Sequence, residues 1–210
     1  MLRLFDTARG EVRVLEPREP GKVSMYVCGP TVYGPPHLGH GRFSLVFDVL
    51  RRYLEWNDVE VLYVSNVTDV DDNIINRANR EGIPWTEVAT YWEQVWWAAM
   101  DAIGVKRPSI DPHASAFIER MVELISDLVD HGMAYETVDG VYFQAGRIED
   151  YGLLARQSID SLRAGARVEA NEDKHSSIDF ALWKKAKVGE PSWPSPWGEG
   201  RPGWHTECVV

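Results

Sequence analysis

The run His37-Leu38-Gly39-His40 has the residue types and spacing that most suggest chemistry in this sequence. A short apolar run, Val23 to Val27, precedes it and predicts a buried strand. A loop with two glycines and three prolines joins the two, and a long amphipathic stretch follows. A helix N-terminus after such a loop binds phosphate, because its first N–H groups are unpaired and the helix dipole is positive there. The spacing therefore predicts a phosphate site at the two histidines.

A plainer interpretation gives the same residues only structural roles. His37 and His40 then cap a helix, Cys28 is a core thiol, and the prolines stiffen a turn. A four-residue pattern alone is a weak signal. The strand before it and the helix after it favour the chemical interpretation.

Apolar periodicity predicts the elements that must position these residues. Residues 39–56 have helical spacing and residues 59–64 are β-branched and short, so strand, helix and strand form a βαβ unit. Such a unit closes right-handed into a parallel sheet, which predicts a Rossmann-like α/β fold. Ligands bind such sheets at the carboxyl ends of the strands, where Cys28 and residues 66–69 fall.

The rest of the chain alternates helices with turn-rich segments. Asp71 and Asp72 are expected at a helix N-terminus, and the tryptophans of the next helix are expected in its core. The other expected elements are a hairpin over 2–15, helices over 86–103 and 116–131, a hairpin over 134–143, a strand or helix turn over 180–185, and an ordered irregular loop over 189–203.

Composition limits the class of protein. The 210 residues include 22 basic and 32 acidic side chains, a net charge of −10, which does not fit a broad basic face for nucleic acid. No leader or membrane-spanning apolar run is visible, and the two cysteines form no disulfide framework. We therefore expect a cytoplasmic protein with no membrane partner.

Three stretches of the chain resemble the cysteinyl-tRNA synthetases. Residues 25–33 with the His37–His40 run are similar to that family's form of the HIGH signature of class I aminoacyl-tRNA synthetases. Residues 68–72 and 203–208 are similar to its T-D-x-D-D and G-W-H-x-E-C segments. The resemblance implies an incomplete class I catalytic core with an inserted α+β connective region. Residues 1–112 would be the first half of the catalytic domain, 113–199 the insertion, and 200–210 the return into the catalytic domain.

The resemblance implies ATP-dependent activation of cysteine to cysteinyl-adenylate, with Mg²⁺, and its transfer to tRNA(Cys). It also implies a Zn²⁺ held by Cys28 and Cys208, since zinc binds a thiolate far better than a serine hydroxyl. The implied catalytic residues are His37 and His40; the implied ATP-binding residues are Gly29, Thr31, His37, Gly39 and His40; and the implied cysteine pocket contains Cys28, Gly29, Thr68 and Trp204.

Two residues beside Cys208 are also candidate ligands. On a strand, Cys208 would share a face with Thr206, whereas His205 and Glu207 would point the other way. The family does not use these two positions as ligands either. We therefore do not expect His205 or Glu207 to hold the metal.

The sequence lacks several features that the cysteinyl-tRNA synthetases have. It lacks the K-M-S-K-S loop, since residues 184–187 do not match it, and it lacks the other two zinc ligands and the anticodon-binding domain. We expect a truncated chain that is inactive alone and monomeric as a full-length protein. The alternatives are a mycothiol-pathway cysteine:aminosugar ligase, a shortened non-catalytic module, and a half-enzyme completed by a second chain, whose cut would expose apolar surface.

Overall fold

The computed structural model describes residues 2–154, 156–157, 173–203 and 205–210. The chain divides into two compact units, residues 17–117 and residues 1–16 with 118–210. The N-terminal hairpin thus groups with the C-terminal residues. The predicted three-part division at 112 and 199 remains a prediction.

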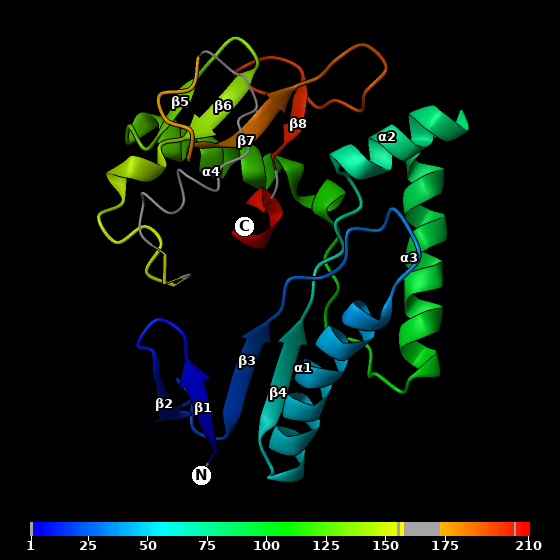
Figure 1. Ribbon diagram of the computed structural model, residues 1–210, viewed down its shortest axis with the longest axis vertical. Helices are drawn as coiled ribbons and strands as arrows, with labels where there is room; N and C mark the ends of the chain where they lie inside the picture. The colour runs from blue at the N-terminus through cyan, green and yellow to red at the C-terminus, as the bar shows by residue number, and fades with distance from the viewer. Residues whose placement is uncertain (1, 155, 158–172, 204) are drawn as a thin grey trace. The chain divides into compact units, whose positions relative to one another are not determined.

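The 17–117 unit contains the predicted βαβ arrangement. Strand β3 (Lys22–Tyr26) leads to helix α1 (Leu38–Trp56), which leads to strand β4 (Glu60–Val64). The two strands pair in parallel, from Lys22↔Glu60 to Tyr26↔Val64, and α1 runs beside β4 (Figure 1). The parallel pairing confirms the Rossmann-like α/β fold for this part of the chain.

Further parallel pairing continues past the end of β4. Val64 and Val67 bridge in parallel to Ile110 and His113, so the segment before residue 114 lies along β4 and its extension. Two helices cover this region, α2 (Asp72–Glu81) and α3 (Trp85–Ala102). Their shared core comprises Val32, Val67, Ile74, Ala78, Val88 and Ala89. This core fixes the segments at the carboxyl ends of both strands.

Helix α2 begins where the sequence predicts. Asp71 is its N-cap, and the carboxylate accepts a hydrogen bond from the N–H of Asn73 at 2.8 Å. The helix ends at Gly82, whose φ of 68° is left-handed, a conformation that glycine adopts without steric cost. The structural interpretation of Asp71 as a helix cap is confirmed.

Helix α1 does not bury the apolar face that its periodicity suggests. Its buried residues are Ser44, Asp48 and Leu54, whereas Val46 and Val49 are 57% and 62% exposed. Asp48 accepts hydrogen bonds from Arg52 Nε at 2.7 Å and from the N–H of Lys106 at 3.1 Å. The helix therefore turns a polar stripe toward the loop after α3 and exposes an apolar stripe.

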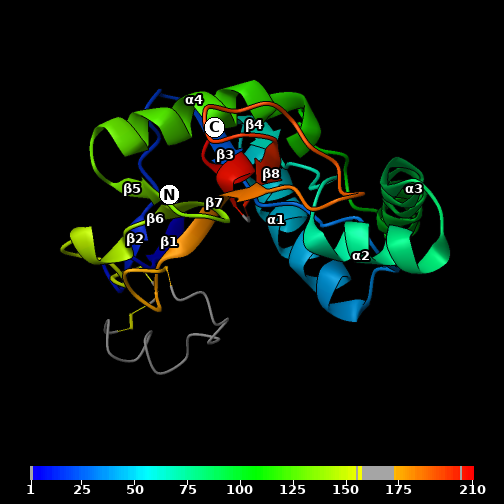
Figure 2. The ribbon, with the colours of Figure 1, turned by 90° about the horizontal axis from the view of Figure 1, so that it is seen from above.

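The other unit is built on an antiparallel sheet. Its strands are ordered β5 (Ala134–Glu136), β6 (Gly140–Phe143), β7 (Phe180–Lys185) and β8 (Gly200–Pro202). Helix α4 (Ile118–Asp130) packs along this sheet (Figure 2). The β5–β6 hairpin and the strand β7 agree with the sequence prediction. Strands β1 (Arg3–Asp6) and β2 (Glu11–Val14) form a separate antiparallel hairpin. The described residues also contain three short helices, which are η1 (Ala114–Phe117), η2 (Ala145–Arg147) and η3 (Thr206–Cys208).

Two predictions near the C-terminus are wrong. The loop predicted over 189–203 contains the strand β8, because Gly200 lets the backbone lie against Trp183, where a Cβ would collide with the indole. The strand assumed at Cys208 is the helical turn η3. Among the described residues, no helix is both long enough and apolar enough to cross a membrane.

Candidate functional site

The loop between β3 and α1 is held by backbone hydrogen bonds to the segment after β4. Val27 N–H donates to the carbonyl of Val64 at 2.9 Å, and Thr68 N–H donates to the carbonyl of Pro30, also at 2.9 Å. Val32 N–H donates back to the carbonyl of Thr68 at 3.2 Å. The loop and residues 64–68 therefore run side by side where both strands end, which is the ligand edge of a parallel sheet.

Asn66 joins two of the predicted pocket residues. Its Oδ1 accepts a hydrogen bond from the N–H of Gly29 at 2.7 Å, and its Nδ2 donates to Thr68 Oγ1 at 3.2 Å. A Cβ on Gly29 would collide with the carbonyl of Asn66, so only glycine fits there. Cys28, half-buried, precedes this contact. Gly29 and Thr68 thus lie together, although the sequence pattern gave Asn66 no role of its own.

The two histidines form the N-terminal cap of α1. His37 is the N-cap residue, and its Nδ1 accepts a hydrogen bond from the N–H of Gly39 at 3.1 Å. The Nδ1 of His40 accepts one from the N–H of His37, also at 3.1 Å. A ring nitrogen that accepts an N–H carries no proton, so each neutral imidazole carries its hydrogen on Nε2. Capping and chemistry are therefore compatible: both rings keep an Nε2–H donor.

The two imidazole rings are stacked, which affects the charge of His40. Their centroids are 3.8 Å apart with an interplanar angle of 18°, and the His40 ring meets the edge of Trp96 at 5.3 Å. Burial lowers the pKa of His40 below its usual value, and the nearby His37 lowers it further. His40 is therefore a neutral donor near pH 7.

A small cavity of about 150 Å³ lies in front of this pair. Its lining includes Thr31, Tyr33, His37, His40, Trp92 and Trp96. Arg77 contacts two of these lining residues: its Nη1 donates to the carbonyl of Tyr33 at 2.9 Å, and its guanidinium lies 4.3 Å above the ring of Trp92. The predicted ATP residues Thr31, His37 and His40 are thus neighbours around one hollow.

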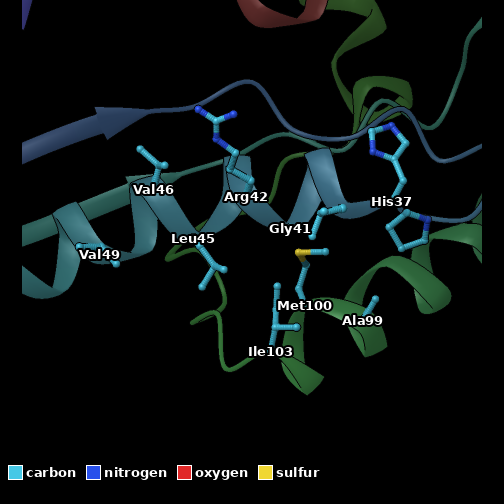
Figure 3. A pocket seen from close by; sticks show the side chains of 11 residues that line it. His37, Gly41, Arg42, Leu45, Val46, Val49, Ala99, Met100 and Ile103 are labelled. Atoms are coloured by element: carbon cyan, nitrogen blue, oxygen red, sulfur yellow. The ribbon is translucent and has the colours of Figure 1, made fainter.

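A larger, apolar cavity of about 690 Å³ opens on another side of His37. It lies between α1 and the end of α3, and Figure 3 shows Leu45 of α1 turned toward Met100 and Ile103. Arg42 lies at its edge. Its lining is unsuited to a polyphosphate, so the smaller cavity is the better candidate for nucleotide chemistry.

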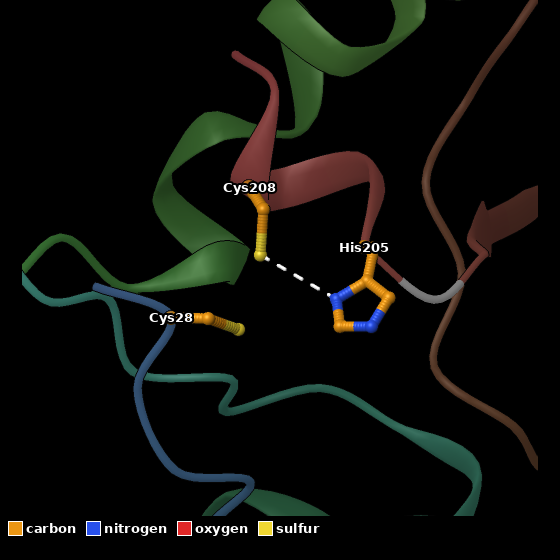
Figure 4. A group of neighbouring side chains, drawn as sticks. All are labelled: Cys28, His205 and Cys208. Carbon is orange, nitrogen blue, oxygen red and sulfur yellow. Dashed lines mark hydrogen bonds between the residues drawn. The ribbon is translucent and has the colours of Figure 1, made fainter. Parts of the chain in front are cut away.

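The other predicted metal ligand, Cys208, lies in the second unit. Its Sγ is 3.6 Å from Nδ1 of His205, and Figure 4 shows the two side chains turned toward each other. His205 is the N-cap of the helical turn η3 and Cys208 is its last residue, and the N–H of Cys208 donates to the carbonyl of His205 at 3.1 Å, so one turn brings the two residues together. Our strand-based reason for dismissing His205 is therefore wrong. Trp204, predicted in the cysteine pocket, lies outside the described residues.

The chain matches a known protein family over most of its length. The family described as "tRNA synthetases class I (C) catalytic domain" matches residues 14–210. A cysteine–tRNA ligase of Thermotoga maritima is 50% identical over 209 residues, which cover 100% of this chain and 45% of the relative. A cysteine–tRNA ligase of Brevibacillus brevis is 51% identical over 190 residues, which cover 90% of this chain and 41% of the relative. The chain therefore spans less than half the length of these relatives.

A solved structure supports the fold. The ternary complex of Agrobacterium radiobacter K84 agnB2 LeuRS with tRNA and LeuAMS matches with a TM-score of 0.50 and 22% identity. The match covers 60% of this chain and 17% of that one. At this identity it shows the class I catalytic fold alone.

Proposed function

Since the chain belongs to the cysteinyl class I tRNA synthetases, we propose that it supplies part of a site that activates cysteine with ATP and transfers it to tRNA(Cys). The observation that supports this most is the His37–His40 cap, which presents two Nε2–H donors at a helix N-terminus. The aminosugar-ligase alternative is not favoured, because the relatives described above are cysteine–tRNA ligases.

In the proposed reaction the carboxylate of cysteine attacks the α-phosphate of ATP and pyrophosphate leaves. The site must stabilise the charge on the phosphates, which preorganised donors do without reorganising. The Nε2–H groups of His37 and His40 and the N-terminal dipole of α1 supply such donors. Mg²⁺ would accompany the nucleotide. The attacking carboxylate is already ionised, so no general base is required.

We propose that the site selects cysteine over serine by binding the thiolate of the substrate to a metal ion. We propose that Cys28 and Cys208 hold Zn²⁺, which supplies an open position that a thiolate fills far better than a hydroxyl does. The donor set fits, because both residues are thiols and Cys208 lies 3.6 Å from a His205 nitrogen. Two ligands of one tetrahedral Zn²⁺ lie about 3.5 Å apart. His205 is thus a further candidate ligand; Gly29, Thr68 and Trp204 remain the proposed pocket residues.

The remaining features of the proposal concern the whole protein. We propose that it acts as a monomer in the cytoplasm, where reducing conditions keep Cys28 and Cys208 as thiols. Its nucleic-acid partner would be tRNA(Cys). The net charge of −10 does not fit a broad basic tRNA-binding face on this chain. Any contact of this chain with tRNA would therefore use a local basic patch.

Cysteine-dependent ATP–pyrophosphate exchange tests the proposal. The chain is assayed alone and joined to the part of the Thermotoga maritima relative that it does not cover, with zinc present and serine as the control amino acid. We expect the joined protein to exchange with cysteine and not with serine. A folded joined protein without cysteine-dependent exchange, or one that charges an aminosugar and leaves tRNA(Cys) uncharged, would overturn the proposal.

A further inference from the structure

Asn66 is a buried polar residue at the ligand edge of the parallel sheet. It is 3% exposed, and it follows the end of β4 by two positions. Its Oδ1 accepts hydrogen bonds from the N–H of Gly29 at 2.7 Å and from the hydroxyl of Tyr26 at 2.9 Å. Its Nδ2 donates to Thr68 Oγ1 at 3.2 Å. One side chain therefore ties the end of β3, the loop after it and the segment after β4.

The pattern of these bonds requires an amide. An amide oxygen has two lone pairs, and both are used, while the amide nitrogen supplies the donor to Thr68. A carboxylate could keep the acceptor role but would add a charge to a buried position and lose the donor. A hydroxyl is too short to span the three partners. Neither aspartate nor serine at position 66 could therefore make all three hydrogen bonds that Asn66 makes.

The bond to Gly29 fixes the peptide that joins Cys28 to Gly29. Because a peptide unit is planar, holding its N–H also sets the direction of the Cys28 carbonyl and the setting of the Cys28 α-carbon. The collision that any Cβ on Gly29 would have with the Asn66 carbonyl shows how closely the two backbones approach. Asn66 therefore acts on two predicted pocket residues, Cys28 and Gly29, through a single bond.

Two other buried polar side chains, Asp48 and Asp179, have purely structural partners. Asp48 binds Arg52 and the N–H of Lys106, and Asp179 binds Tyr135 and the N–H of Ala145. None of these partners is a predicted site residue. The partners of Asn66 include Gly29 and Thr68, which are both predicted to line the cysteine pocket.

We propose that Asn66 is a positioning residue for the amino-acid pocket, which it serves by fixing the Cys28–Gly29 peptide and orienting the Thr68 hydroxyl. The inference rests on the proposed function. It predicts that Asn66 affects the use of cysteine more than the use of ATP. Gly29 and Thr68 both belong to the predicted cysteine pocket, whereas Gly29 alone of these partners is also a predicted ATP residue, and the histidine cap and its cavity are built from other residues.

The test measures exchange kinetics of Asn66→Ser in the joined protein described above. We expect the KM for cysteine to rise about tenfold, in line with losing one or two hydrogen bonds, while the KM for ATP changes by less than about twofold. Asn79→Ser on the exposed face of α2 is the matched control. A merely structural role would lower the folded fraction and leave the KM for cysteine unchanged.

A milder variant covers the case in which Asn66→Ser does not fold. Tyr26 is 46% exposed, so Tyr26→Phe keeps the fold and removes one of the two bonds to Oδ1. We expect a rise of about twofold to threefold in the KM for cysteine alone. If both variants catalyse ATP–pyrophosphate exchange as fast as the wild type does, with an unchanged KM for cysteine, the inference is overturned. Absence of cysteine-dependent exchange in the wild type overturns the proposed function first, and the inference with it.

Hydrogen exchange of the Gly29 N–H tests the proposed contact without an activity measurement. In the 210-residue chain, Asn66→Ser should release the Gly29 N–H and speed its hydrogen exchange relative to wild type. An unchanged exchange rate at Gly29, in a variant that melts as the wild type does, contradicts the proposed contact.

Discussion

At the scale of single residues, His37 combines a capping role with a proposed catalytic one. Its Nδ1 accepts the N–H of Gly39, which satisfies one of the unpaired donors at the start of α1. The other ring nitrogen carries the hydrogen proposed to bind phosphate. A Cβ on Gly39 would come within 2.9 Å of the His37 ring, so glycine leaves the room that this ring needs.

The two roles of His37 can be separated by substitution. Asparagine is among the best N-cap residues, so His37→Asn should keep the stability of α1 while it removes the Nε2–H donor. We expect exchange activity of the joined protein to fall about 100-fold with stability changed by less than about 0.5 kcal/mol. His37→Ala, measured by exchange and thermal melting, should lose the same activity and about 1 kcal/mol of stability as well. Full activity in His37→Asn would remove His37 from the catalytic assignment.

Residue patterns predicted this cap but not its supporting contacts. The His37–His40 spacing is local, so the sequence alone indicates a helix start with two imidazoles. Arg77 and Asn66 act through partners 44 and 37 positions away, which no short motif records. The strand-based argument against His205 fails for a similar reason, because it assumes strand alternation where the chain makes a helical turn.

At the scale of elements, a pair of side chains ties α3 to the segment along β4. The Nε2 of His113 lies 3.0 Å from Oε2 of Glu93, and the indole of Trp97 donates to Oε1 of the same carboxylate at 3.1 Å. Burial by itself lowers the pKa of His113, but the hydrogen bond and charge of Glu93, with Asp69 and Asp111, raise it above its usual value of 6.5. The charged pair is therefore favoured in the folded state.

This contact predicts a pH-dependent contribution to stability. A histidine whose folded pKa is raised contributes most below its unfolded pKa and loses the contribution as pH rises through the folded pKa. The difference in melting temperature between wild type and His113→Gln should therefore be largest near about pH 6 and shrink toward about pH 9. The pair is partly exposed, so the effect stays below about 1 kcal/mol.

The control for this prediction is His131→Gln. His131 is exposed at the end of α4 and contacts a backbone carbonyl, that of Asp127, instead of a carboxylate. We expect His131→Gln to shift the melting temperature by only a small amount, without the decrease between about pH 6 and about pH 9 that is expected for His113→Gln. A difference for His113→Gln that widens with rising pH would contradict the assigned pairing.

At the scale of the whole molecule, periodicity predicts the extent of α1 but not the side that it buries. The helix over 39–56 and both strands of the βαβ unit were predictable, because their apolar spacing is local. Arg51 and Arg52 of this helix donate to the carbonyls of Arg107 and Gly104 at 2.7 Å. These partners lie more than fifty positions along the chain, so tertiary contacts decide the orientation of the helix.

The stripe that α1 leaves exposed leads to a prediction about the behaviour of the chain in solution. Leu38 and Trp56 are 90% and 82% exposed, and Val46 and Val49 lie between them along the same side of the helix. A contiguous apolar surface of this kind binds hydrophobic dyes and promotes association. We expect the 210-residue chain to bind such a dye and to scatter more light as its concentration rises. The double substitution Val46→Gln and Val49→Gln should reduce both signals by about half.

The same double substitution should leave the fold intact, because both side chains are exposed. The free energy of unfolding is expected to change by less than about 0.5 kcal/mol for each exposed site. Val138→Gln is the matched control, since Val138 is 78% exposed in the turn between β5 and β6, far along the sequence from the α1 stripe. If that control lowers dye binding as much as the α1 variant does, the association surface lies elsewhere. If it does not, the unburied side of α1 is the surface through which the isolated chain associates.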